Sequence, residues 1–259
     1  MKIVLVGAGK LATNVGVALQ KAGHDITQVY SRTMDSAQEL GRKLWCEATN
    51  DLSQLSKTAD VYLFAVKDNV LENVAANVCV GREHSVFVHT AGSMPIGIFE
   101  GKVRHYGVMY PMQTFSKERE AFSVESDIPI FIESNNTIAN DVIKSMAESI
   151  SGKVYQLASD DRKYLHLAAV FACNYVNHFY DIAHGLLADK NIPFEVMLPL
   201  IDETARKVHI MSPHDAQTGP AVRYDRNIIE NHLKMLEDYP TVQLIYDIMS
   251  RSIHECYNE

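Results

Sequence analysis

Over its first 158 residues the chain alternates short apolar runs with amphipathic stretches. Several of the apolar runs are nearly continuous rather than interrupted at every second position, which is typical of strands that are covered on both faces. Alternation of such strands with helices builds a parallel sheet between two layers of helices. The pattern predicts strands at residues 2–6, 25–30, 61–65, 85–89, 103–108, 128–133 and 153–157.

Beyond this point the β-rich runs stop and only helical spacing remains. A long helix is predicted at residues 161–188, and Pro193 and Pro240 suit the first turns of two later helices. We therefore expect an α/β domain with a doubly wound parallel sheet at 1–158 and an all-α domain at 159–259. The later helices are predicted at 193–208, 225–237 and 240–254, with irregular chain at 211–224.

The first predicted strand leads directly into the sequence GAGKLA at residues 7–12. Its two glycines allow a tight turn and close approach of the backbone to a ligand, and Ala12 allows the next helix to pack closely. The start of that helix offers free N–H groups and a positive dipole end to a pyrophosphate. A strand before the motif and a second strand about twenty residues later make the motif specific. We predict a dinucleotide-binding Rossmann domain whose cofactor contacts include Gly7, Ala8, Gly9, Lys10 and Leu11.

The end of the second predicted strand indicates which dinucleotide binds. NAD enzymes place an acidic residue there to bond the ribose 2′-hydroxyl, and that residue would repel a 2′-phosphate. Here the strand ends at Tyr30 and is followed by Ser31, Arg32 and Thr33, whose two hydroxyls and guanidinium suit a phosphate. We therefore predict NADP rather than NAD as the cofactor. The alternative is that Arg32 is a solvated loop residue that only stacks on the adenosine.

Two further predicted strands end at the same edge of the sheet, where open α/β sheets bind their ligands. One leads into small residues that let the backbone approach the cofactor. The other ends in a histidine, which lies either near the nicotinamide or in a structural hydrogen bond. We predict further cofactor contacts from Ala65, Val66, Lys67, His89, Thr90 and Ala91.

Composition argues against several classes of partner. The formal net charge of −8 opposes binding to nucleic acid or to anionic lipid. No uncharged apolar run reaches the length of about 18 residues that crosses a bilayer, and the first run, at residues 3–6, is too short for a signal peptide. The four cysteines are far apart, which argues against a zinc site and a disulfide framework. We expect a cytoplasmic protein with no bound metal and with neither nucleic acid nor membrane as a partner.

Four of these segments, GAGKLA, SRT, AVKD and HTAG, together resemble the N-terminal domain of pyrroline-5-carboxylate reductases and deazaflavin-dependent NADP reductases. Three later motifs resemble a bacterial family of uncharacterised NADP oxidoreductases: YPMQTF at 110–115, LHLAAVFACNYVNH at 165–178 and TGPAVRYD at 218–225. That family joins a reductase-like Rossmann domain to a helical domain of unassigned function, similar to the dimerisation domain of 6-phosphogluconate dehydrogenase. The resemblance implies NADP-dependent redox chemistry and no particular substrate.

The long predicted helix carries the candidate catalytic residues. The similar helix of β-hydroxyacid dehydrogenases has a catalytic lysine four residues before an asparagine, whereas here Asn174 matches the asparagine and Val170 stands at the lysine position. The general acid/base of that family is therefore missing. At 100° per residue, one arc of this helix contains six polar residues, and the arc faces either solvent or a cleft against the Rossmann domain. The six residues are Lys163, His166, Asn174, Asn177, His178 and Asp181. In a cleft, His166 and His178 would exchange a proton and Asn174 would orient a carbonyl or amide.

Two loops offer candidate substrate contacts. The guanidinium of Arg223 would bind a substrate carboxylate, pair with Asp225 or pair with a residue of another subunit. Asp225 can also cap the next helix. Gln113 and Thr114 would border the nicotinamide pocket, or the aromatic residues beside them would pack the domain interface. The candidate substrate contacts are therefore Gln113, Thr114 and Arg223.

Together these features predict an oxidoreductase that transfers hydride between NADP(H) and a small imine, a carbonyl compound or a second redox cofactor at the interdomain cleft. The alternative is a catalytically inactive nucleotide-binding protein with a regulatory or structural role, which Val170 in place of a lysine favours. The apolar C-terminal helices also predict a partner surface, and hence a homodimer built through them.

Overall fold

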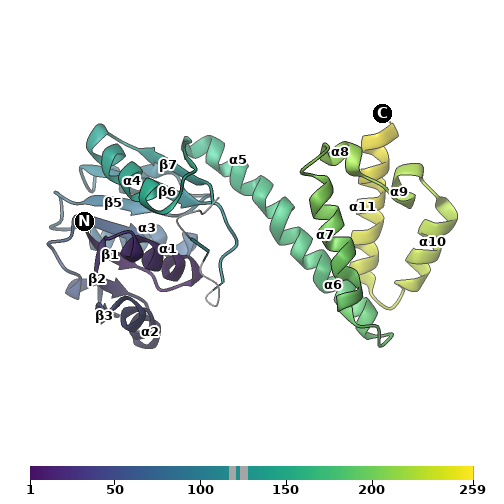
Figure 1. Cartoon of the computed structure of the whole chain (residues 1–259), viewed down its shortest axis with the longest axis horizontal. Coiled ribbons are helices and arrows are strands. Elements are labelled where there is room, and N and C mark those ends of the chain that lie inside the picture. The colour runs from purple at the N-terminus through teal and green to yellow at the C-terminus, as the bar shows by residue number, and fades with distance from the viewer. Residues whose placement is uncertain (117–120, 123–127, 259) are drawn as a thin grey trace. The chain divides into compact units, whose positions relative to one another are not determined.

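A computed structural model of the chain describes residues 1–116, 121–122 and 128–258 (Figure 1). The chain forms two compact units, Met1–Asn174 and Tyr175–Glu259. The sequence placed the domain boundary at 158/159, before helix α5 (Ser159–Ala169), whereas α5 packs with the first unit. A compact unit is defined by contacts and not by independent folding, so the domain boundary stays a prediction.

The first unit is built on one sheet of eight strands, in the order β3-β2-β1-β4-β5-β6-β7-β8. Neighbouring strands are parallel except for β6 and β7, which are antiparallel. The order reverses direction between β1 and β4, which is the switch point where open α/β sheets form a crevice. The strands are β1 (Lys2–Val6), β2 (Asp25–Tyr30), β3 (Glu47–Thr49), β4 (Val61–Phe64), β5 (Val86–His89), β6 (His105–Pro111), β7 (Ile130–Ser134) and β8 (Val154–Gln156).

The expected fold class is confirmed, with two differences in the sheet. Each predicted strand corresponds to an observed one, but the short strand β3 was not predicted because only Thr49 in it is buried. The sheet is mostly rather than wholly parallel, since β7 and β8 run opposite to the other strands. An apolar run looks the same in either chain direction, so the reversal has no signature in the hydrophobic pattern.

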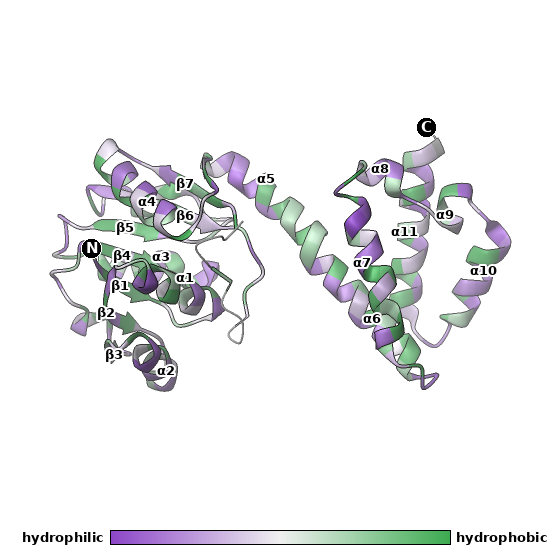
Figure 2. Ribbon diagram, in the orientation of Figure 1, coloured by the Kyte–Doolittle hydropathy of each residue, from purple (hydrophilic) through white to green (hydrophobic). Residues whose placement is uncertain are grey.

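Helices cover both faces of the sheet, as the continuous apolar strands predict. On β1, Ile3 and Leu5 belong to one buried cluster, while Val4 and Val6 belong to a second cluster with Phe87. Figure 2 shows the same hydrophobic centre in the strands of the first unit. The covering helices are α1 (Lys10–Lys21), α2 (Met34–Leu44), α3 (Asp68–Val78) and α4 (Thr137–Ile150), with short 3₁₀ turns at Leu52–Gln54 and Ile96–Phe99.

The helix predicted at 161–188 is not uniform. It consists of α5, a π-helical segment Val170–Tyr175 and α6 (Val176–Ala188). A π-helix closes i→i+5 hydrogen bonds and therefore has more residues per turn than an α-helix. The count of 100° per residue fails across this segment, so the polar residues before and after it do not form the single arc expected from the sequence.

The second unit is helical but buries little of its own apolar surface. Of its described hydrophobic residues, only Ile229 and Leu236 are buried, each with 7% exposure, and α6 has no buried residue. The stretch expected to be irregular at 211–224 contains two short helices. The elements after α6 are a 3₁₀ turn Phe194–Met197, α7 (Leu198–Lys207), α8 (Pro213–Ala216), α9 (Pro220–Arg223), α10 (Arg226–Met235) and α11 (Pro240–Asn258). Over the described part of the chain, no helix combines the length and the apolar character needed to span a membrane.

Candidate functional site

The turn between β1 and α1 brings the backbone of the first strand against that of β4. Gly7 has φ +129°, and its N–H donates to the carbonyl of Tyr30 at 2.8 Å. A Cβ at Gly7 would lie 2.4 Å from the carbonyl oxygen of Ala65. A side chain would therefore be both strained and in collision with backbone, so the turn requires glycine here.

The start of α1 fits an anionic ligand. Gly9 is the N-cap residue and supplies no side-chain hydrogen bond, and the first turn contains no acidic residue. A Cβ at Gly9 would meet no atom within 4 Å, so the turn opens onto free space. Backbone N–H groups at a helix start, together with the positive end of the dipole, bind phosphate. The residues present thus fit the pyrophosphate of a dinucleotide, with Lys10 exposed beside it.

The chain after β2 presents the predicted ribose-phosphate contacts. Arg32 and Thr33 are exposed and Ser31 is half-buried. The Thr33 hydroxyl donates to Ser36 Oγ at 2.9 Å, at the start of α2. Within the described residues, the Arg32 guanidinium pairs with no carboxylate, so it is available to a ligand.

A cavity of about 700 Å³ lies at the carboxyl ends of β4, β5 and β6 and includes Leu11, in the first turn of α1, in its lining. All of its lining residues belong to the first unit, and α5 and the π-helical segment supply one wall. The cavity brings together predicted residues from five separate parts of the sequence. These are Leu11, Ala65, Val66, Thr90, Ala91, Gln113, Thr114, His166 and Asn174.

A tyrosine and a histidine meet in the wall of this cavity. The hydroxyl of Tyr110 on β6 lies 3.1 Å from Nδ1 of His166 on α5, and the two rings meet edge to face. Both pack against Gly92, where a Cβ would lie 2.7 Å from Nδ1 of His166 and 2.9 Å from Cζ of Tyr110. Burial raises the pKa of the Tyr110 hydroxyl; Arg162 opposes this, whereas Asp68 and Cys173 add to it.

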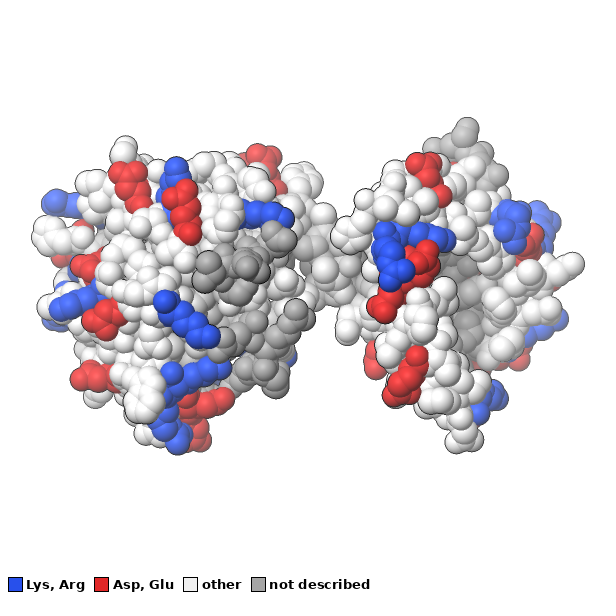
Figure 3. All heavy atoms as spheres, viewed as in Figure 1, with Lys and Arg blue, Asp and Glu red and all other residues white. Residues whose placement is uncertain are grey.

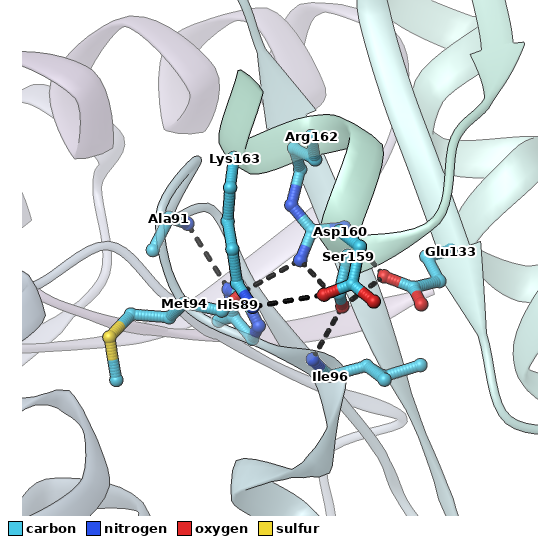
Figure 4. A network of polar contacts seen from close by, with 9 residues as sticks. All are labelled: His89, Ala91, Met94, Ile96, Glu133, Ser159, Asp160, Arg162 and Lys163. Atoms are coloured by element: carbon cyan, nitrogen blue, oxygen red, sulfur yellow. Dashed lines mark hydrogen bonds and ion pairs between the residues drawn. The ribbon is translucent and has the colours of Figure 1, made fainter. Parts of the chain in front are cut away.

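A buried arginine network fixes α5 on the sheet (Figure 4). The fully buried Arg162 donates from Nη1 to Oε2 of Glu133 at 2.6 Å and from Nη2 to the carbonyl of Met94 at 2.7 Å. Ser159 Oγ joins the same carboxylate at 2.7 Å and accepts from the N–H of Ile96 at 3.0 Å. Arg162 lies four residues before His166, on the same helical face, so the network sets the position of the histidine ring.

His89 does not line the cavity. Its ring is fully buried, accepts at Nδ1 from the N–H of Ala91 at 3.2 Å and lies near Phe99. Burial, together with the charge of Arg162, lowers the pKa of His89 to about 3. A neutral histidine in such surroundings fits the structural alternative left open by the sequence. Thr90 beside it is also buried and donates to the carbonyl of Phe64 at 3.1 Å.

An asparagine on α1 ties the nucleotide turn to another wall of the cavity. Asn14 Nδ2 donates to the carbonyl of Ser116 at 2.7 Å, and its Oδ1 accepts from the N–H of Ala121 at 2.9 Å. The same Nδ2 also bonds the carbonyl of Lys10, in the first turn of α1. The side chain thus joins the helix that fits the pyrophosphate to the chain that follows Gln113 and Thr114.

Two family models match the chain. One, described as NADP oxidoreductase coenzyme F420-dependent, matches residues 2–91, and a domain of unknown function, DUF2520, matches residues 128–253. A crystal structure from Bacteroides fragilis, described as a "putative NADP oxidoreductase", is 52% identical, with 98% of each chain covered and a TM-score of 0.94. The chain belongs to the family of this NADP oxidoreductase.

More distant structures share the fold of this NADP oxidoreductase family. Protein TM1727 from Thermotoga maritima is 24% identical, with 99% of this chain and all of the other covered and a TM-score of 0.79. The 1-pyrroline-5-carboxylate reductase of Streptococcus pyogenes is 16% identical, with 98% of each chain covered and a TM-score of 0.66. No curated protein matches the chain.

In this member of the family, two of the predicted site residues belong to the second unit. His178 is exposed on α6 and Arg223 lies on α9, both in the second unit. Arg223 Nη2 donates to Oδ2 of Asp225 at 2.8 Å, which is the internal contact considered as an alternative. Asp225 is the N-cap residue of α10, but its side chain makes no capping bond, so the expected cap is wrong. The catalytic and substrate roles of His178 and Arg223 stay predictions.

Several residues that line the cavity were not predicted as site residues, among them Asp68, Gly92, Tyr110 and Cys173. Tyr110 was considered only as an interface residue, and its partner His166 is 56 positions away in the sequence. Asp68 was considered only within the motif AVKD, and its place at the start of α3, just beyond the ligand-binding end of β4, is the signal that could have found it. It accepts a hydrogen bond from Ser93 across the same edge.

The described residues contain no group of three His, Cys, Asp or Glu side chains placed to hold a metal ion. All four cysteines are free thiols. On the face of the molecule shown in Figure 3, basic and acidic side chains are interspersed.

Proposed function

We propose that the chain is an NADP-dependent oxidoreductase that binds the nicotinamide end of NADP(H) and a small imine or carbonyl substrate in the cavity of the first unit. The supporting observation is the continuity of the site. Leu11 in the first turn of α1, the residues that follow β4 and β5, and the Tyr110–His166 pair line one cavity. Reduced nicotinamide supplies a hydride when bound, and the chain binds, orients and shields the reactants.

The preference for NADP rests on the chain after β2. An exposed guanidinium without a carboxylate partner, flanked by two hydroxyl side chains, suits a 2′-phosphate. NADP in the description of the Bacteroides fragilis relative and in the matching family model supports the same choice.

The lining of the cavity narrows the substrate class. Among the described lining residues there is no lysine or arginine, and Asp68 is the one carboxylate. Most of the remainder is apolar or uncharged. These side chains favour an uncharged or cationic substrate, such as a ring imine or a ketone, over a carboxylate anion. A carboxylate substrate would need a cation from elsewhere, which is the role expected of Arg223.

The test combines nucleotide binding with turnover. Purified protein is titrated calorimetrically with NADP⁺ and NAD⁺, and NADPH oxidation is followed at about 340 nm with ring imines, ketones, ketoacids and a deazaflavin. Arg32→Ala should weaken NADP⁺ binding about 10-fold or more and leave NAD⁺ binding unchanged, because only NADP carries the 2′-phosphate. Lys43→Ala, at an exposed basic residue in the last turn of α2, is the matched control. Equal loss for both nucleotides would contradict NADP recognition by Arg32.

The same assay separates the non-catalytic alternative. Tight NADP⁺ binding without substrate-dependent oxidation across the whole panel would indicate a nucleotide-binding regulatory or structural protein. The alternative rests on Val170 at the position of the missing lysine. In the structure Val170 begins the π-helical segment and is not among the residues that line the cavity.

We also propose a homodimer through the helices of the second unit. Large apolar side chains of this unit are exposed in the single chain, including Leu200 at 59%, Leu244 at 59% and Ile248 at 54%. Only two described hydrophobic residues of this unit are buried, and a second copy of the same surface would cover the exposed side chains. Sedimentation at micromolar concentration should give twice the chain mass, and a monomeric mass would overturn the proposal.

A further inference from the structure

Reduction of a C=N or C=O bond requires a proton as well as a hydride, and the missing lysine leaves its source open. Four protonatable side chains occur among the described residues of the cavity lining: Asp68, Tyr110, His166 and Cys173. Asp68 is held by the hydroxyl of Ser93, at the start of α3. Only Tyr110 and His166 are hydrogen-bonded to each other, at 3.1 Å, so they form the one coupled pair in this wall.

The surroundings of Tyr110 suit a group that holds its proton until it reacts. The residue is 8% exposed, and burial raises the pKa of its hydroxyl. The charged and titratable groups that face it are Asp68 from α3, Arg162 and His166 from α5, and Cys173 from the π-helical segment. Arg162 favours the phenolate, whereas Asp68 and Cys173 disfavour it. The phenol is therefore protonated near neutral pH and is available as an acid.

The pair is held from three sides. Tyr110 lies on β6, whose register with β7 places it opposite Phe131. His166 lies one helical turn after Arg162, which is anchored on Glu133 and Met94. The absence of a side chain at Gly92 leaves the space that both rings occupy. The geometry is thus fixed by packing before any ligand binds, which is what a positioned acid requires.

We propose that the Tyr110 hydroxyl donates the proton that accompanies hydride transfer, with His166 as the group that stabilises and reprotonates it. The inference rests on the proposed function. In reduction, hydride adds to the imine or carbonyl carbon, the π-electron pair moves to nitrogen or oxygen, and that atom takes the Tyr110 proton. As Nε2 of His166 takes up a proton from solvent, the Nδ1 proton of His166 passes to the phenolate. One solvent proton is consumed for each hydride transferred.

The first test needs neither substrate nor nucleotide. Histidine-labelled wild-type chain, Tyr110→Phe and Tyr106→Phe are compared by ¹⁵N NMR. Tyr106 is on the same strand, outside the cavity lining, and is the matched control. Loss of the Tyr110 hydroxyl should shift the ring-nitrogen resonances of His166, while the control leaves them unchanged. An unchanged His166 spectrum in Tyr110→Phe would overturn the coupled pair.

The second test measures turnover of NADPH with 1-pyrroline and with cyclohexanone as probes. Tyr110→Phe should lower kcat about 100-fold or more, as expected for loss of a general acid, with the Kd for NADP⁺ within about twofold of wild type. His166→Asn should lower kcat less and alter its pH profile, because the phenol remains. If the wild-type chain turns over a substrate and Tyr110→Phe lowers kcat by less than about threefold, this inference is overturned while the proposed function stands. Wild-type binding of NADP⁺ without turnover of any substrate overturns the proposed function and this inference together.

A variant away from the pair itself tests the geometry. In Gly92→Ala the added Cβ would force Tyr110 and His166 apart, because it would lie within 3 Å of both rings. We expect a fall in kcat with unchanged NADP⁺ affinity. Gly97→Ala is the control, since its Cβ would lie 3.8 Å from its nearest neighbour, Oε2 of Glu100. Equal kcat values in the two alanine variants would contradict the requirement for the closed pair.

Discussion

The buried guanidinium of Arg162 allows a quantitative prediction about stability. Its side chain is fully buried, and the Glu133 carboxylate that it contacts at 2.6 Å is 19% exposed. In Arg162→Met a similar volume remains but the charge is lost. The carboxylate would then keep only the Ser159 hydroxyl as a donor, at 2.7 Å. A largely buried charge that loses its partner is destabilising, because the desolvation cost remains and the attraction does not.

The expected loss follows from that geometry. Removing one partner of a buried ion pair costs about 3–5 kcal/mol, and the partial exposure of Glu133 places this case near the lower end. A loss of about 3 kcal/mol corresponds to a fall in Tm of roughly 6–12 °C for a unit of this size. In Arg162→Met/Glu133→Gln no charge is left unpaired, so the double variant should be less destabilised than the sum of the two single variants by about 2 kcal/mol.

Urea unfolding, followed by far-UV circular dichroism, measures each corner of this double-mutant cycle. Comparable m-values show that the same surface unfolds in all four proteins. A loss below about 1 kcal/mol in Arg162→Met, or strict additivity in the cycle, would refute the reasoning. The ¹⁵N resonances of His166 in Arg162→Met provide a separate readout, because a loosened α5 should also loosen the Tyr110 contact.

Two further predictions concern His89 and the glycine turn. Folding lowers the pKa of His89 from 6.5 to about 3. Between pH 6.5 and pH 3 the unfolded chain therefore binds a proton at His89 that the folded chain does not, so the free energy of unfolding decreases as the pH falls. From pH 6.5 to 5 the loss should be about 2 kcal/mol, and urea titrations of His89→Asn should show a flatter profile, whereas an identical pH slope would contradict the assignment. Gly7→Ala should lower Tm and abolish nucleotide binding, because its Cβ would lie 2.4 Å from the Ala65 carbonyl oxygen. Gly9→Ala, with nothing within 4 Å, should keep the wild-type Tm and only weaken NADP⁺ binding in calorimetry; equal Tm values for the two variants would count against this account.

The sequence predicted the fold well wherever burial alone decides the structure. The strands β1 and β2 have the predicted bounds because their apolar runs are covered on both faces and end in glycine or polar residues. The short strand Glu47–Thr49 was missed since two of its three residues are not fully buried. The π-helical segment was missed because an extra residue in a turn changes the phase of a helix and not its apolar content.

The candidate site was predicted less completely than the fold, for a physical reason. Ala65 and Thr90 directly follow strands, and Leu11 lies in the first turn of the helix after β1, so the sheet edge brings all three to the cavity whatever the rest of the chain does. The contact between Tyr110 and His166 depends instead on where α5 docks, and that position is set by the Arg162 network. The spacing of residues in the sequence does not reveal this contact, because it forms between β6 and α5 only after the Arg162 network has positioned α5.

The side chain of Asn14 connects the predicted nucleotide site to a part of the chain about a hundred residues later. One amide bonds the first turn of α1 and, at Ser116 and Ala121, the chain that follows the cavity residues Gln113 and Thr114. The helix end that fits the pyrophosphate and this later chain therefore depend on a single side chain, and its loss would remove a hydrogen bond from three backbone groups on two distant segments.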